Sequence, residues 1–183
     1  HIKREEILNS LYDFCYLEPK LPGEEKTYID TQGICLRTDM TREEIISYLE
    51  SIRETNITAD LAFYAFRDLS KIDWTPFIKA SIERNPVIIE ALKDLSIDEI
   101  INKLENMPSE SIYDGFRVAQ PDEVWNFQRG DGIEKAISLA NILKSRKVSP
   151  IAIEINNEEA TVSFSNKSIG WKSSKNLKKK IEL

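Results

Sequence analysis

The sequence has few of the residues on which thiol enzymes and metal sites depend. It contains one histidine, His1, and two cysteines, Cys15 and Cys35. A zinc site needs clustered cysteine, histidine or carboxylate ligands, and no such spacing occurs, so we expect no metal and no cofactor. Two cysteines that flank a Pro/Gly loop are compatible with one disulfide or with two free thiols, and both alternatives stay open.

Long apolar runs and an excess of basic residues are also missing. No run approaches the roughly 20 apolar residues that cross a bilayer, so we expect no transmembrane segment. Acidic residues outnumber basic ones by 31 to 25, and the net charge of -6 is a poor match to nucleic-acid phosphates. We therefore predict no nucleic-acid partner. The lysines of residues 172–180 are interpreted as a solvated run that protects a sheet edge.

The composition that is present is typical of a globular protein. The 183 residues are 41% apolar and 31% charged, which favours one compact unit with two parts. We place a mainly helical subdomain at residues 1–107 and a smaller α+β core at residues 108–183.

Helical periodicity dominates the first part. Residues 2–14 have helical spacing before a stretch with proline and glycine ends the pattern. Five short helices are expected between residues 38 and 107. Two of them begin with a capping box, Thr41 to Glu44 and Ser96 to Glu99, in which a hydroxyl and a carboxylate satisfy the first free amides of the helix.

The pattern changes after Met107. We expect a loop with a short turn at residues 121–127, then a strongly amphipathic helix at 133–147. Beyond Pro150 the apolar period becomes two, which predicts strands at 151–155 and 160–165 around a turn at 156–159. A further strand pair is expected at 168–173 and 178–183. This order predicts an α+β fold: a helical bundle, then a long helix packed on a small antiparallel β-sheet.

The segment QRGDGIEKAISLANILKSR, residues 128–146, has several interpretations. As a phosphate loop it lacks the lysine, the hydroxyl and the preceding strand of the nucleotide-binding motif. Arg129-Gly130-Asp131 as an adhesion tripeptide is a chance match in most proteins. As a helix start the segment is good, because Asp131 and Glu134 complement the positive end of the helix dipole.

The longer segment 119–155 resembles the core of transglutaminase-like domains, the bacterial branch related to cysteine peptidases. In that family a short helix with an aromatic anchor leads to a GDC-x-D-K-A turn, a helix rich in leucine and alanine, and a β-hairpin. The matching residues here are Gly130, Asp131, Gly132, Glu134, Lys135 and Ala136. The resemblance implies a papain-like core. Because many bacterial members are exported, it also implies a lean toward the periplasm, the cell surface or secretion.

The family's chemistry needs a cysteine at the first turn of that helix, a histidine that takes its proton, and a residue that orients the histidine. The resemblance puts the cysteine at Gly132, the histidine within residues 160–165 and the orienting carboxylate within 170–174. None of these positions holds the required residue. We therefore expect a non-catalytic domain that acts as a binding or structural module for a peptide, a protein or a glycan.

Seven residues near the presumed cleft are candidates for binding: Tyr113, Trp125, Arg129, Asp131, Gly132, Glu134 and Trp171. We expect Tyr113 and Trp171 to be exposed and Trp125 to belong to the core. Other functions stay open. One is a transglutaminase-like or cysteine peptidase-like hydrolase whose catalytic residues lie outside this fragment, and another is a carboxylate-based hydrolase. A third is a helical interaction module at residues 38–107.

Overall fold

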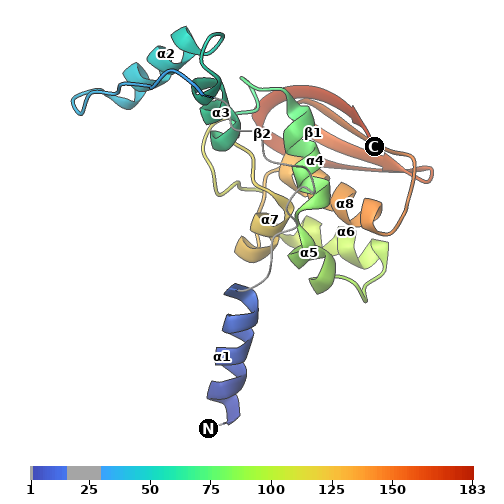
Figure 1. Cartoon of the computed structure of the whole chain (residues 1–183). Helices are drawn as coiled ribbons and strands as arrows, with labels where there is room; N and C mark the ends of the chain where they lie inside the picture. The colour runs from blue at the N-terminus through green and yellow to red at the C-terminus, as the bar shows by residue number, and fades with distance from the viewer. Residues whose placement is uncertain (1, 16–29) are drawn as a thin grey trace.

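The computed structural model describes residues 2–15 and 30–183 of the chain. The helices run in the order α1 (Ile2–Cys15), α2 (Arg42–Ile52), α3 (Ile57–Phe66), α4 (Trp74–Glu83), α5 (Pro86–Ala91), α6 (Ile97–Asn106), α7 (Pro121–Phe127) and α8 (Gly132–Ser145). Two strands follow, β1 (Ile151–Phe164) and β2 (Lys167–Glu182). The coarse α+β prediction is confirmed (Figure 1).

The helix starts follow the capping signals in the sequence. Thr41 accepts the N–H of Glu44 while the Glu44 carboxylate accepts the N–H of Thr41, and Ser96 and Glu99 repeat this arrangement at α6. The five helices expected between residues 38 and 107 are α2 to α6. Residues 121–127, expected as a turn, form the helix α7. No helix in the described part of the chain is long and apolar enough to cross a membrane.

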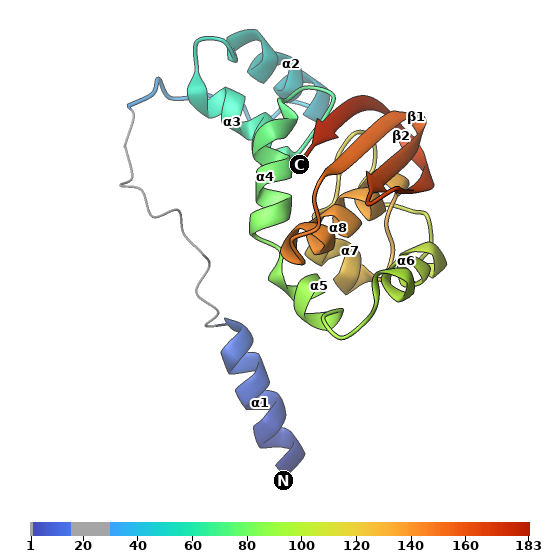
Figure 2. The same cartoon turned by 90° about the vertical axis from the view of Figure 1, so that its right-hand side faces the viewer.

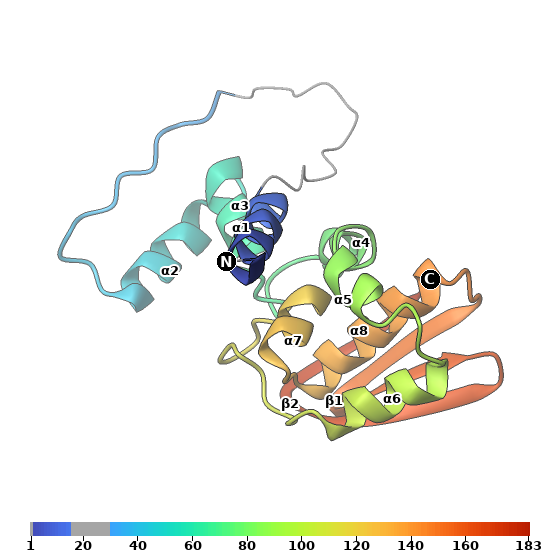
Figure 3. The same cartoon turned by 90° about the horizontal axis from the view of Figure 1, so that it is seen from below.

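Helix α8 lies at the centre of the fold. Figure 3 shows it between the hairpin of β1 and β2 on one side and α4, α5 and α7 on the other, and each of these elements contacts it. Residues 132–143 are all buried, including Glu134, Lys135 and Asn141. The helix expected at residues 133–147 is present, but it is not amphipathic over residues 132–143, because none of its faces there is exposed to solvent. Its polar side chains point into the protein and find partners there.

One apolar core surrounds α8. It combines Phe77 of α4, Leu104 of α6, Leu139 of α8, Ile153 of β1 and Trp171 of β2. Burying a side chain of this size contributes about 1.5–3 kcal/mol. Residues on both sides of position 107 share this core, so α4, α5 and α6 are held by the same packing that holds the sheet.

The two strands form one long antiparallel hairpin that curls over α8 (Figure 2). The turn expected at residues 156–159 was wrong, because β1 continues through them. The chain reverses at Ser165 and Asn166, whose φ angles of 43° and 62° are typical of a two-residue hairpin turn. The two strands expected at 168–173 and 178–183 are parts of the single strand β2.

The hairpin is irregular where the turn had been expected. Asn157 pairs with Leu177 and Glu159 pairs with Lys172, so one residue of β1 stands opposite residues 173–176 of β2. Asn157 and Asn176 have φ angles of 54° and 49°, a left-handed conformation that asparagine tolerates better than most residues. We call residues 173–176 the β2 bulge. It lies against the start of α8.

Candidate functional site

Gly132, the first residue of α8, packs directly on the backbone of β2. A Cβ atom added at this position would lie 2.3 Å from the carbonyl oxygen of Lys172 and 2.6 Å from that of Trp171. Real Cβ atoms do not approach backbone so closely, so any other residue requires β2 to move. The position to which the resemblance assigns a nucleophile is thus a contact between helix and strand.

The side chain of Asp131 stabilises the contact between the start of α8 and β2. Its carboxylate caps α8 by accepting the N–H of Ile133 at 3.0 Å. The same carboxylate accepts the hydroxyl of Ser173 at 2.7 Å, and the N–H and hydroxyl of Ser174 at 2.7 and 3.1 Å. Asp131 is fully buried. One side chain therefore joins the helix start to the β2 bulge.

Glu134 is buried one turn further along α8. Its carboxylate accepts the hydroxyl of Ser111 at 2.6 Å, the N–H of Ala119 at 2.7 Å and the N–H of Asp131 at 2.8 Å. Burial raises the pKa of Glu134, and these hydrogen bonds oppose that rise. The carboxylate ties the loop before α7 to the helix.

Two lysines hold the chain segment that follows α6. The Nζ of Lys135 donates to the carbonyl of Met107 at 2.7 Å and to the hydroxyl of Ser109 at 3.1 Å. The Nζ of Lys175, in the β2 bulge, donates to the carbonyl of Tyr113 at 2.6 Å. Burial lowers the pKa of both lysines, while nearby carboxylates oppose the change. The segment is therefore fixed to α8 and β2.

A hollow of about 630 Å³ opens between this segment and the β2 bulge. We call it the site cleft. It is lined by Ser109, Glu110, Ser111, Tyr113, Asp114, Gly115, Phe116, Arg129, Ser174, Lys175 and Asn176. It carries one exposed aromatic ring, one accessible guanidinium, two carboxylates and several hydroxyls. Such a mixture suits recognition of a ligand with both apolar and polar groups.

The structure brings some of the seven candidate binding residues to the cleft and not others. Tyr113 and Arg129 line it. Asp131, Gly132 and Glu134 lie beneath it in the core. Trp171 is 6% exposed, so the expectation that it lies on the surface was wrong: it stands on the inner face of β2.

Trp125 is half-buried and packs against the core, as a mainly interior residue would. Its exposed part lines a different hollow, next to α6. It therefore takes no part in the site cleft.

Tyr113 makes hydrogen bonds through its hydroxyl and a cation–π contact through its ring. The hydroxyl donates to Glu123 at 2.6 Å and accepts from Arg67 at 3.0 Å, while the guanidinium of Arg117 stands 3.7 Å from the ring centroid. Arg67 also pairs with Glu123 at 2.5 Å. Burial opposes ionisation of Glu123, but the hydrogen bonds from Arg67, Tyr113 and Gln120 outweigh it and lower its pKa to about 2. Tyr113 is thus a rigid wall of the cleft.

Phe116 and Arg129 are the cleft residues most available to a ligand. Phe116 is 41% exposed, and the Arg129 side chain is exposed to the same extent. One Nη of Arg129 donates to the carbonyl of Ser111 at 3.1 Å, which orients the guanidinium, and Glu110 stands 3.9 Å away. Sequence reasoning missed Lys175 and Ser111. No local signal marks them, since their partners are distant in the sequence.

The titratable groups lining the cleft are Glu110, Tyr113, Asp114, Arg129 and Lys175. Among residues 2–15 and 30–183, no group of three or more histidine, cysteine or acidic residues is placed to hold a metal ion. Cys35 is a free, exposed thiol away from the cleft lining, while His1 and the side chain of Cys15 lie outside the described part of the chain.

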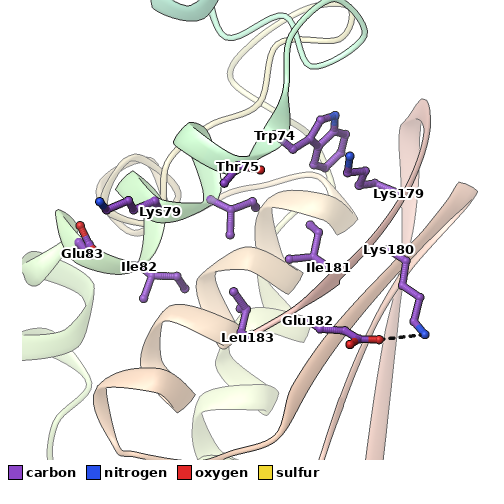
Figure 4. Close-up of a pocket in the computed structure, with 11 residues that line it drawn as sticks. Trp74, Thr75, Lys79, Ile82, Glu83, Lys179, Lys180, Ile181, Glu182 and Leu183 are labelled. Carbon is purple, nitrogen blue, oxygen red and sulfur yellow. Dashed lines mark ion pairs between the residues drawn. The ribbon is translucent and has the colours of Figure 1, made fainter.

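A third hollow, of about 400 Å³, lies between α4 and the end of β2. Figure 4 shows Trp74, Ile82, Ile181 and Leu183 around it, with Lys180 paired to Glu182 on its rim. None of the seven candidate binding residues lines it.

Comparisons of the chain with models of known protein families, with curated proteins and with solved structures gave no match.

Proposed function

We propose that this chain is a non-catalytic domain of the transglutaminase-like type that binds an extended peptide segment of a partner protein in the site cleft. The observation that carries the proposal is the contact of Gly132 with the backbone of Lys172. A nucleophile at the first turn of α8 would need room for its side chain and for a substrate. The strand occupies that room.

The arrangement of α8 and the hairpin supports the transglutaminase-like part of the proposal. In that family a helix start carrying the nucleophile faces the strands of a curled antiparallel sheet. Here the start of α8 faces β2 in the same way, and Ser173 and Ser174 bond to Asp131. The polar groups at this junction hold the fold together, which supports a role without catalysis.

The cleft's side chains favour a peptide as the ligand. Phe116 offers an exposed aromatic face to an apolar side chain, and Arg129 offers a guanidinium to a carboxylate or a carbonyl. The amide of Asn176 can donate to or accept from a peptide backbone, whereas the hydroxyls of Ser111 and Ser174 already donate to Glu134 and Asp131. A neutral glycan would use the ring but not the charge of Arg129.

Selection from a library of random peptides displayed on phage, with the full chain as bait, tests the proposal. Titration of a selected, fluorescently labelled peptide should give an affinity that falls at least tenfold with Phe116→Ser or Arg129→Ala. Phe127→Ser and Lys144→Ala are matched controls, because both residues are exposed and lie outside the cleft. We expect these controls to bind like the wild type.

Two results contradict the two halves of the proposal separately. Selected peptides that bind the cleft variants as tightly as the wild type contradict the binding site. Labelling of the wild-type chain by a thiol-directed peptidase probe, blocked by excess peptide substrate, contradicts the absence of catalysis.

A further inference from the structure

The sequence contains two Asp-Gly dipeptides, Asp114-Gly115 and Asp131-Gly132. An aspartate followed by glycine can close a ring on the backbone more readily than other aspartates, because glycine has no side chain to obstruct attack by its own nitrogen. The product of that ring is isoaspartate. The chain thus carries the same reactive group twice, and the structure places the two copies in different surroundings.

The first dipeptide is accessible and unrestrained. Asp114 and Gly115 lie in the loop between α6 and α7, line the site cleft and are exposed. Nothing lies within 4 Å of the position that a Cβ atom of Gly115 would take. Within the described ranges, no hydrogen bond or ion pair holds the Asp114 carboxylate, which interacts with Lys175 through charge alone. The N–H of Gly115 also donates to no acceptor there.

The second dipeptide is locked in the core. The buried Asp131 carboxylate accepts one hydrogen bond from Ile133, one from Ser173 and two from Ser174. Gly132 packs on the backbone of β2. Ring closure here would require the carboxylate to leave all of these donors and water to reach the interior, which amounts to local unfolding.

We propose that Asp114 is a modification site that converts to isoaspartate, and that the conversion weakens ligand binding in the site cleft. The backbone nitrogen of Gly115 attacks the carboxyl carbon of Asp114. A C–N bond forms, the C–OH bond of the protonated carboxyl breaks, and the hydroxyl leaves as water with the amide proton. Water then adds to one carbonyl of the resulting succinimide. Opening at the main-chain carbonyl gives isoaspartate, and opening at the other carbonyl restores aspartate.

The conversion changes the wall of the cleft. Isoaspartate carries the main chain through the former side chain, so the backbone gains one methylene group and the carboxylate moves. Phe116, two residues further along, supplies the exposed ring of the cleft. A longer backbone at position 114 shifts that ring relative to Arg129. This effect on the ligand rests on the proposed function, whereas the modification itself does not.

Peptide mapping by mass spectrometry, after incubation of the full chain at neutral pH and physiological temperature, tests the modification. Isoaspartate should accumulate on the order of tenfold faster at Asp114 than at Asp131, because the second site reacts only after local opening. In the chain unfolded by urea, the two sites should react at similar rates. Asp114→Glu should abolish the reaction at position 114, since the longer side chain would have to close a larger ring.

Titration with a selected, labelled peptide tests the effect on the cleft. Chromatography separates the isoaspartate form from the unreacted chain. The isoaspartate form should bind at least tenfold more weakly, as Phe116→Ser should. The Asp114→Glu chain is the control for incubation, and its affinity should be the same before and after it.

Two results overturn the inference. One is a folded chain in which Asp114 gains isoaspartate no faster than Asp131. The other is an isoaspartate form that binds the peptide as tightly as the unreacted chain although Phe116→Ser weakens binding. Unchanged binding by Phe116→Ser and Arg129→Ala would instead contradict the proposed function and, with it, the effect on the ligand. The mapping experiment uses no ligand, so it decides the modification in either case.

Discussion

The carboxylate of Asp131, at the start of α8, accepts both the backbone N–H and the hydroxyl of Ser174 in β2. Together with Ser173, these bonds fix the β2 bulge on the end of the helix. Asp131 therefore serves as the joint between helix and sheet.

Asp131→Ala should lower the free energy of unfolding by about 2–4 kcal/mol. The change removes an N-cap and leaves the Ser173 and Ser174 donors without their acceptor in the interior. Urea denaturation followed by circular dichroism measures the loss. Asp94→Ala is the control, because Asp94 is exposed and caps no helix, and it should change stability by less than about 0.5 kcal/mol. Equal stability of the two variants would show that Asp131 does not stabilise the junction between α8 and the β2 bulge.

The two buried tryptophans should respond differently to loss of the indole N–H. The Nε1 of Trp74 donates to the carbonyl of Leu69 at 2.8 Å, whereas that of Trp171 has no acceptor among the described residues. Trp74→Phe therefore breaks a hydrogen bond and Trp171→Phe removes an unpaired donor. We expect Trp74→Phe to cost about 1–2 kcal/mol more in thermal or urea unfolding. The reverse order would mean that Trp171 has a partner, such as an internal water.

The pair of Arg67 and Glu123 should make stability depend on acid pH. The pKa of Glu123 is lowered from 4.5 to about 2 in the folded chain. Its ionised form therefore stabilises the fold above about pH 4.5, and this contribution is lost as the pH falls toward 2. In Glu123→Gln, the free energy of unfolding should fall less steeply than in the wild type between about pH 4.5 and pH 2.

Urea titrations at several pH values between 2 and 6 measure this effect. Glu158→Gln should keep the wild-type slope, since Glu158 is exposed in β1. A Glu123→Gln chain with the same pH dependence as the wild type would contradict the assignment.

Local signals in the sequence were enough to predict the helices other than α7. Thr41 and Ser96 mark helix starts through hydroxyl and carboxylate pairs that lie within four residues, and both capping boxes are present in the structure. The alternating pattern after Pro150 also identified strand structure correctly. These features depend on neighbours in the chain, so one sequence contains the information for them.

The path of the hairpin was not predictable in the same way. Asn156-Asn157 and Ser165-Asn166 are both good turn sequences, and Asn157, Ser165 and Asn166 all adopt positive φ angles. The pairing of β1 with the whole length of β2 decides between them. Because of that pairing, the chain reverses at Ser165-Asn166, and Asn157 forms only an irregularity in the hairpin. That pairing depends on residues far apart in the sequence, so local propensity does not predict it.

The candidate site was predictable in part for the same reason. The segment around Gly132 was singled out correctly as a helix start, but no local pattern predicted that Glu134 and Lys135 are buried. Their partners, Ser111, Ala119 and Met107, lie 15 to 28 residues away in the chain. Charged residues in a helix are usually exposed, so sequence alone predicts a surface position for them. A hydrogen-bond partner in the interior allows such a residue to be buried instead.

The stability of Gly132→Ala relative to Gly33→Ala tests the central claim most directly. Both changes add one methyl group, but at Gly132 it would meet the backbone of β2, whereas at Gly33 nothing lies within 4 Å. We predict that urea unfolding will show a loss on the order of 3 kcal/mol or more for Gly132→Ala and a change within about 1 kcal/mol for Gly33→Ala. A Gly132→Ala chain as stable as the wild type would mean that the start of α8 has room for a side chain, and the case for a closed, non-catalytic junction would fail.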